Sequence, residues 1–143
     1  MLAGDSELSL LQIPGYNLIS TGKSCSAHSG VAIYLHKAYQ YNIINNNITS
    51  EFWDCQLIEI CVTDKHHVNK KIILGNLYRP PRPTNEHVYY FINDMEKIFD
   101  KLKNYKNVLI VGNFNINLLR CKENNSVNDN DFLDNILSNS YIP

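Results

Sequence analysis

Prolines at positions 80, 81 and 83 divide this chain into two hydrophobic patterns. Proline has no N–H to donate to a strand ladder, so the apolar run at 71–78, which is typical of a strand, must end there. After the prolines, Thr84 is a suitable helix N-cap, and apolar residues follow it at spacings of three and four, which predicts a helix whose apolar stripe covers a sheet. The stripe consists of Val88, Phe91, Ile92, Met95, Ile98, Phe99 and Leu102.

Other apolar runs predict further strands on both sides of this break. We expect strands at 15–20, at 31–36 as a largely buried strand with 39–44 as its neighbour, at 52–62, and at 107–112 as a short buried strand. Residues 131–138 predict a second, weaker helix with the apolar stripe Phe132, Ile136 and Leu137. The sequence therefore predicts one layered α/β domain over residues 1–143, with at least one sheet and a helix on its outer face.

Composition limits the class of protein but does not identify a binding partner. An apolar content of 44% with 19% charged residues is that of a soluble globular protein, and a net charge of -1 gives no overall attraction to a polyanion. No apolar stretch approaches the ~20 residues that a bilayer span needs, so we expect an intracellular protein of the nucleus or cytoplasm, not secreted and without a membrane partner. The four cysteines lack close CxxC pairing and are expected to be reduced, with Cys55 and Cys61 in a sheet.

Two predicted strands end in polar residues, where a rigid scaffold can hold functional groups at the solvent. These ends are the stretches 76–81 (Asn-Leu-Tyr-Arg-Pro-Pro) and 111–119 (Val-Gly-Asn-Phe-Asn-Ile-Asn-Leu-Leu). Together with 13–18 (Ile-Pro-Gly-Tyr-Asn-Leu) and 29–35 (Ser-Gly-Val-Ala-Ile-Tyr-Leu), they resemble, in order and approximate spacing, the endonuclease/exonuclease/phosphatase superfamily. Within it, the likeness is to the endonuclease domains of jockey-like non-LTR retrotransposons.

The resemblance implies a two-sheet α/β sandwich, partial in this chain, with mostly antiparallel or mixed sheets and flanking helices. It also implies a site that cleaves a phosphodiester of DNA with Mg²⁺, a cation suited to anionic oxygen ligands. Tyr78 matches the family tyrosine that points toward the scissile phosphate, and Arg79 is a weaker candidate for phosphate contact. In the family's Gly-Asp-Phe-Asn motif, Asn113 stands at the Asp position and Asn115 at the Asn position.

The Asn at position 113 changes the expected chemistry. A neutral amide cannot act as a base, and losing general-base catalysis removes ~10²- to 10⁴-fold in rate. The family's metal-binding Glu motif and its Ser-Asp-His motif are expected to lie beyond the two ends of this sequence, so no residue is assigned as a metal ligand. The chain is therefore interpreted as a fragment of such an endonuclease domain, truncated at both ends and without activity.

Other interpretations stay open. The scaffold would serve equally as a non-enzymatic protein that binds nucleic acid or protein, and strand edges exposed by truncation would favour self-association. Tyr78 would simply end a strand with its ring packed, and Arg79 would pair with a neighbouring acid. Asn113 and Asn115 would satisfy backbone groups in a turn, a common role of asparagine.

Overall fold

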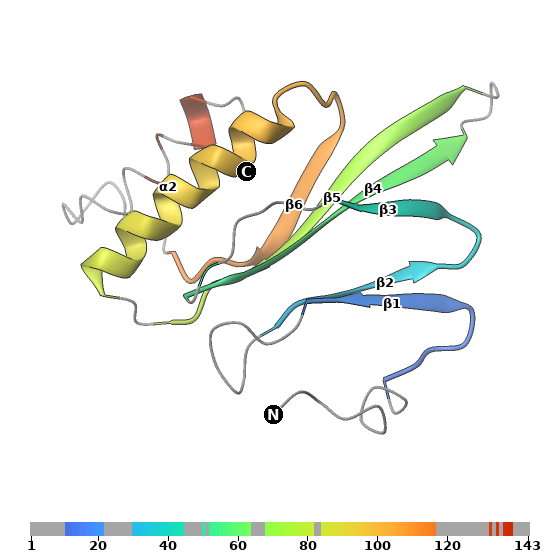
Figure 1. Ribbon diagram of the computed structural model, residues 1–143, viewed down its shortest axis with the longest axis horizontal. Helices are drawn as coiled ribbons and strands as arrows, with labels where there is room; N and C mark the ends of the chain where they lie inside the picture. Colours follow the sequence, from blue (N-terminus) through green and yellow to red (C-terminus); the bar gives the residue numbers. More distant parts are fainter. Residues whose placement is uncertain are drawn as a thin grey trace. The chain divides into compact units, whose positions relative to one another are not determined.

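The computed structural model describes residues 11–21, 30–44, 50, 52–63, 68–81, 84–116, 132, 134 and 136–138, with residue 85 as backbone only. The chain forms two compact units, one of Met1–Arg79 and Tyr105–Asn113, the other of Pro80–Asn104 and Phe114–Pro143. The described strands belong to the first unit, and the described helical residues belong to the second (Figure 1). That these units make one domain over residues 1–143 stays a prediction.

The smaller sheet of the first unit is an antiparallel pair. Strand β1 (Tyr16–Ser20) runs beside β2 (Ala32–His36), with Tyr16 opposite His36 and Ser20 opposite Ala32. Both strands were predicted within one residue. The prediction that β2 is largely buried is wrong, because burial alternates along it: Ile33 and Leu35 are buried, whereas the residues between and beside them are exposed. The strand therefore covers the core with one face only.

The larger sheet has the strand order β3-β4-β5-β6. These strands are β3 (Gln40–Ile44), β4 (Asp54–Thr63), β5 (Asn69–Tyr78) and β6 (Val108–Asn113). The first three pair antiparallel, and β6 pairs parallel to β5, so the sheet is mixed. The expected pairing of the runs at 31–36 and 39–44 is wrong: the short link 37–39 leads from β2 in one sheet to β3 in the other, where β3 pairs with β4.

A hydrophobic core joins the two sheets of the first unit. Even-numbered residues of β4 point toward the smaller sheet, where Ile58 and Ile60 cluster with its buried side chains. One hydrogen bond also links the sheets, because the amide nitrogen Nδ2 of Asn76 on β5 donates to the carbonyl oxygen of Ala32 at 2.9 Å. The cluster is made of Ile19, Ile33, Leu35, Ile58 and Ile60, with Tyr41, Val62 and Leu74 packed against it.

Strand β6 differs from its prediction in burial. Leu109 and Val111 keep 54% and 43% of their surface exposed, so the expected buried strand is wrong in that respect. Both residues stand on the face that points toward the smaller sheet, since Leu109 pairs with Leu74 and Val111 with Asn76. This face of β6 is therefore more exposed than the same face of β4, where Ile58 and Ile60 are buried.

In the second unit, helix α2 (Asn85–Leu102) begins where the sequence predicts it. Thr84 is its N-cap, and its hydroxyl oxygen accepts a hydrogen bond from the N–H of His87 at 3.2 Å. All seven residues of the predicted stripe are buried. That the stripe covers a sheet stays a prediction.

The second predicted helix is helical at its described positions, which are 132, 134 and 136–138. Phe132 is buried and lies 5.5 Å from Phe91 of α2 between ring centroids. Leu137 is 55% exposed, so its place in an apolar stripe is wrong. Aromatic contact therefore attaches this segment to α2 through one residue of the expected stripe.

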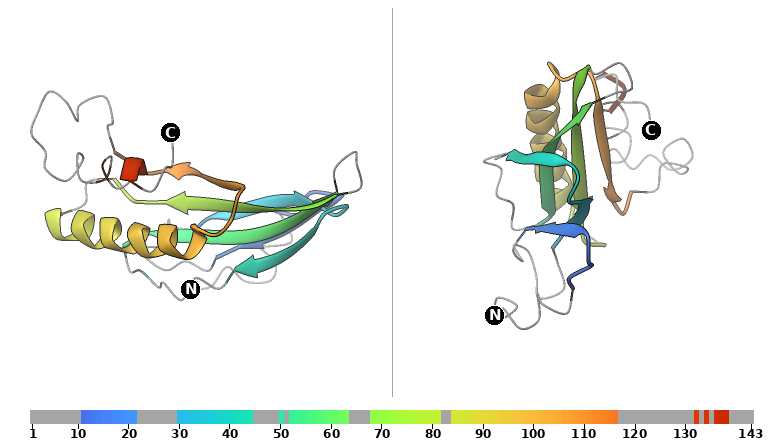
Figure 2. Two further views of the ribbon diagram at one scale, coloured as in Figure 1. Left: turned by 90° about the horizontal axis from the view of Figure 1, so that it is seen from above. Right: turned by 90° about the vertical axis from the view of Figure 1, so that its right-hand side faces the viewer.

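The architecture is mixed α/β with two sheets of two and four described strands, which confirms the coarse fold prediction; Figure 2 shows it from two further sides. None of the helices in the described ranges is long and apolar enough to cross a bilayer.

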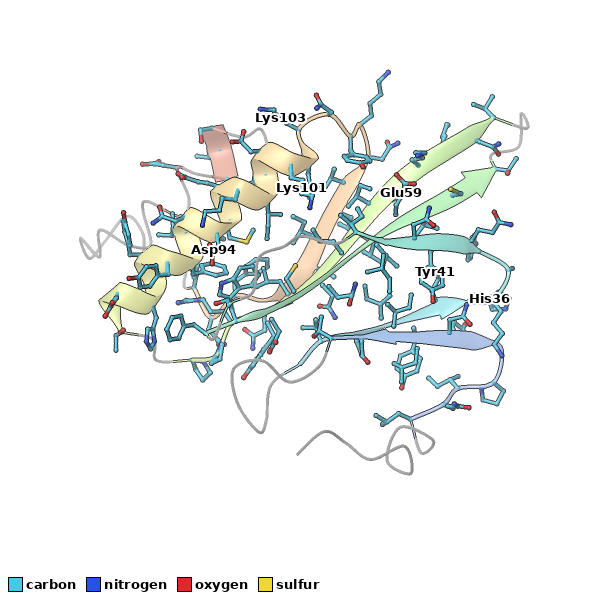
Figure 3. All side chains as sticks on the ribbon, in the orientation of Figure 1. His36, Tyr41, Glu59, Asp94, Lys101 and Lys103 are labelled. Atoms are coloured by element: carbon cyan, nitrogen blue, oxygen red, sulfur yellow. The ribbon has the colours of Figure 1, made fainter. Side chains whose placement is uncertain are left out.

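One nearly buried acid on β4 has a cationic partner. Glu59, labelled in Figure 3, keeps 10% of its side chain exposed, and its two carboxylate oxygens lie 3.0 and 3.2 Å from Nζ of Lys71 on β5. This pairing raises the pKa of Lys71, through the hydrogen bond first and then the charge of Glu59. A second pair, Lys103 with Asp100 at 3.2 Å, has the same lysine exposure of 64% but an acid that is 75% exposed.

These two ion pairs make a matched test of how burial of the acid affects the contribution of the pair to thermal stability. We expect Lys71→Met to lower the Tm by several degrees, because it leaves Glu59 in a poorly solvated place without its cation. Lys103→Met should change the Tm by about a degree at most. Thermal unfolding followed by circular dichroism measures both. Glu59→Gln in the Lys71→Met background should recover part of the loss; equal effects of the two lysine changes would contradict this account.

Candidate functional site

Three polar residues stand side by side where β5 and β6 end. In the register of the larger sheet, Tyr78 on β5 pairs with Asn113 on β6 and, on its other side, with Asp54 at the start of β4. Residues directly opposite each other on neighbouring strands project to the same face, with Cβ atoms about 4.5–5.5 Å apart. We call Asp54, Tyr78 and Asn113 the strand-end row. It brings together two residues that the sequence singled out and one, Asp54, that it missed.

The next positions along the same face are polar as well. Gln56 and Asn76 pair with each other one step inward from the strand-end row, before the apolar Ile58 and Leu74 begin the core. Both amides are held through their nitrogens: Nε2 of Gln56 donates to the carbonyl oxygen of Leu57 at 3.2 Å, and Nδ2 of Asn76 donates to Ala32. With the row, they form the polar strand end, defined as Asp54, Gln56, Asn76, Tyr78 and Asn113.

Backbone contacts hold β5 against β6 at this point. The N–H of Arg79 donates to the carbonyl oxygen of Asn113 at 2.9 Å, which continues the pairing one residue past β5. Gly112, paired with Leu77, has a φ of 149°, and a Cβ there would overlap the carbonyl oxygen of Leu77 and lie 2.7 Å from its carbonyl carbon. A glycine is therefore required beside Asn113, because its hydrogen permits an approach that any side chain would block.

Burial and charge act together on Cys55, the residue after Asp54. Burial first, and then the negative charge of Asp54, raise the pKa of the Cys55 thiol from 9.0 to about 12. Both effects disfavour a second negative charge in this part of β4. The Cys55 thiol is therefore protonated at neutral pH, which makes it a weak nucleophile. The expectation that Cys55 and Cys61 lie in a sheet is confirmed, since both are residues of β4.

Arg79 and Asn115, the other residues predicted for the site, follow shortly after residues of the strand-end row in the sequence. Arg79 is buried, with 4% of its surface exposed, so its guanidinium would have to turn outward to meet a phosphate in solution. Asn115 belongs to the second unit and has a φ of 49°, a left-handed conformation that asparagine tolerates well, which agrees with the alternative of a backbone role. Between the two asparagines, Phe114 lies 5.9 Å from Phe132 within the second unit. Phosphate contact by Arg79 and a catalytic role for Asn115 stay predictions.

Sequence reasoning missed Asp54 and Gln56, and it included Asn76 only as part of the stretch 76–81, although a signal was present. Positions 56, 58, 60 and 62 alternate onto one face in the sequence, and extending that alternation back by two residues reaches Asp54. Its pairing with Tyr78 depends on a register between segments that are far apart in the chain. In the described part of the chain, no three side chains of His, Cys, Asp or Glu gather as a metal cluster would require.

No model of a known protein family matches this chain, and no curated protein sequence matches it either.

Replacing Gly112 by alanine tests the close approach of β5 and β6. Gly15 is a matched control, since it also has a positive φ, 86°, but a Cβ there would meet its nearest atom at 4.0 Å. Gly15→Ala should cost about 1–2 kcal/mol of backbone strain. Gly112→Ala should lower the Tm much further or prevent folding, because the added carbon overlaps the backbone of Leu77. Equal losses in thermal unfolding would mean that backbone strain alone matters at Gly112.

The raised pKa of Cys55 predicts selective thiol chemistry. At pH 8, three pKa units leave Cys55 with about a thousandfold less thiolate than an ordinary cysteine, so iodoacetamide should label the exposed Cys61 first and Cys55 only after unfolding. Because its folded pKa lies above its unfolded value, Cys55 contributes stability below pH 9 that is lost as the pH rises toward about 12. Peptide mapping by mass spectrometry measures the labelling. Equal rates at Cys55 and Cys61 in folded protein would contradict the burial of Cys55.

Proposed function

We propose that this chain derives from a Mg²⁺-dependent phosphodiesterase domain, similar to the DNA-nicking endonuclease domains of non-LTR retrotransposons, and that it cleaves DNA little or not at all. The motif resemblance over 13–18, 29–35, 76–81 and 111–119 supports the family. The fold supports it only in the coarse sense that the chain is mixed α/β with two sheets. Function must be argued from the site.

The observation that carries the proposal is the pairing of Tyr78 with Asn113 on neighbouring parallel strands. These residues come from motifs more than thirty positions apart, and the resemblance assigns both to one phosphodiester site. Side chains paired in this way share a face and lie within reach of one phosphate group. The Tyr78 hydroxyl would donate a hydrogen bond to a phosphate oxygen, and the Asn113 amide would donate a second from its nitrogen.

The oxygen donors of the polar strand end fit a hard divalent cation in kind. Asp54 supplies a carboxylate and Asn113 an amide oxygen, and both stand in the strand-end row beside Tyr78. A bound Mg²⁺ would neutralise negative charge that develops on a phosphate. The row carries one carboxylate, however, so any affinity for the cation is expected to be weak.

The same row explains why cleavage is not expected. At position 113 a neutral amide stands where the family has an acid, and an amide cannot take a proton from an attacking water. Asp54 stands on the other side of Tyr78, two strands from β6, so it does not restore a base at position 113. What the site retains is the means to bind a phosphodiester through hydrogen bonds.

Incubation of the purified protein with supercoiled plasmid and Mg²⁺ tests the proposal. We expect weak binding of DNA at low salt and no nicking above that of Tyr78→Ala, because a hydroxyl and an amide contact phosphate without activating water. Tyr78→Ala should also weaken binding at low salt. Gel analysis of nicking and fluorescence anisotropy of a labelled duplex provide the two measurements.

Tyr89→Ala is the control for binding, since this tyrosine of α2 is 62% exposed and stands outside the polar strand end. Binding lost equally in both variants would point to a general surface interaction, as in a non-enzymatic scaffold. Mg²⁺-dependent nicking that disappears in Tyr78→Ala would overturn the expected inactivity. Absence of DNA binding at low salt would overturn the assignment of the site.

A further inference from the structure

Strand β6 is an edge of the larger sheet in the described part of the chain (Figure 1). The N–H of Ile73 donates to the carbonyl oxygen of Asn107, and the N–H of Arg79 donates to that of Asn113. The odd-numbered residues of this segment therefore turn their backbone groups toward β5, and the even-numbered residues in the middle of β6 turn theirs the other way. Outward N–H and C=O groups along a sheet edge are a template for pairing with another strand.

The side chains of β6 do not protect this edge. The strand reads Val-Leu-Ile-Val-Gly-Asn over Val108–Asn113, with neither a charge nor a proline, the residues that commonly block edge pairing. On one face, Leu109 keeps 54% and Val111 43% of its surface exposed. The opposite edge strand, β3, has polar residues at Gln40 and Asn42. Strand β6 is therefore the more apolar of the two described edges.

We propose that the outer edge of β6 pairs with β6 of a second copy of this chain, antiparallel about a two-fold axis at Ile110. Because the backbone groups of Ile110 point outward, it and the partner's Ile110 would exchange two hydrogen bonds. One step along the strand, Leu109 faces the partner's Val111 in a non-hydrogen-bonded pair, whose Cα atoms are about 4.5 Å apart. Symmetry repeats this contact between Val111 and the partner's Leu109. The pairing thus buries the two exposed apolar side chains of β6 against each other.

The charge pattern of the strand is compatible with a second copy as the partner. The register places no like charges opposite each other, and beside the strand the neutral Asn107 faces the partner's Asn113. Two-fold pairing uses the outer edge of β6 in both copies, so the assembly closes as a dimer. Strands of six residues bury less surface than the ~1,200 Å² of a standard interface, so association should be weak and depend on concentration. The proposal does not depend on the proposed function.

Sedimentation velocity of the purified chain tests the proposal without DNA. We expect a monomer–dimer equilibrium in which the dimer forms at roughly 0.1 mM and above. Leu109→Lys/Val111→Lys should weaken dimerisation by about tenfold or more, because the register then brings like charges opposite each other at two places. Leu109→Glu/Val111→Lys should dimerise at least about tenfold more tightly than that variant at low salt, because opposite charges then face each other. About 1 M salt should remove the difference.

Ile43→Lys is the matched control, since Ile43 is 60% exposed on β3, the opposite edge strand. It should leave dimerisation unchanged, and circular dichroism checks that every variant is folded. A chain that stays monomeric up to about 1 mM would overturn the proposal. Equal weakening by Ile43→Lys and Leu109→Lys/Val111→Lys would do the same, because it would place the contact elsewhere.

Nuclear magnetic resonance of the wild-type chain gives a second test that needs no variant. As the concentration rises, the amide proton of Ile110 should shift downfield, because its N–H gains a hydrogen bond. In a mixture of isotope-labelled and unlabelled chains, filtered NOE spectra should connect the methyl groups of Leu109 in one copy with those of the partner's Val111. A dimer without these intermolecular NOEs would overturn the β6 pairing.

Discussion

The parallel pairing of β5 with β6 is the constraint on which the site depends. Parallel neighbours cannot be joined by a tight turn, so a long segment must separate them, and this segment contains α2. Both strands then end at the same edge, where Tyr78 meets Asn113. The close approach is possible only because Gly112 presents no side chain to the backbone of Leu77. Secondary structure alone would put these polar groups in separate loops.

One face of β4 and β5 changes from apolar to polar along the strands, so the same two strands contribute to both the core and the candidate site. Toward the middle of β4 and β5, Ile58 and Leu74 pack with the smaller sheet. Two to four residues further along, the same alternation presents amides, a phenol and a carboxylate. The inner polar residues satisfy backbone carbonyls, as Asn76 does for Ala32, so polarity near the core costs little free energy. The outer row carries a carboxylate, a phenol and an amide.

Electrostatics distinguishes what this row can bind from what it can cleave. On the proposed function, one carboxylate would attract a cation weakly, and a hydroxyl with an amide would hold a phosphate. Neither supplies a base beside position 113, where the amide stays neutral at every pH of interest. The charge of Asp54 instead acts on its neighbour, helping to keep the Cys55 thiol protonated. Under the proposed function, the neutral amide at position 113 would permit binding without catalysis at this strand end.

By itself the sequence determined the local elements, which are the strand and helix ranges, the Thr84 N-cap and the buried stripe of α2. These features follow from the periodicity of apolar residues along the chain, which is a local property of the sequence. It also singled out Tyr78 and Asn113 as polar strand ends. Only the tertiary structure decided that β3 leaves β2 for β4, and that Asp54 joins Tyr78 in one row. The physical reason is that hydrogen bonds between segments distant in the chain set the pairing partner and the register of each strand. A local sequence pattern specifies neither of them.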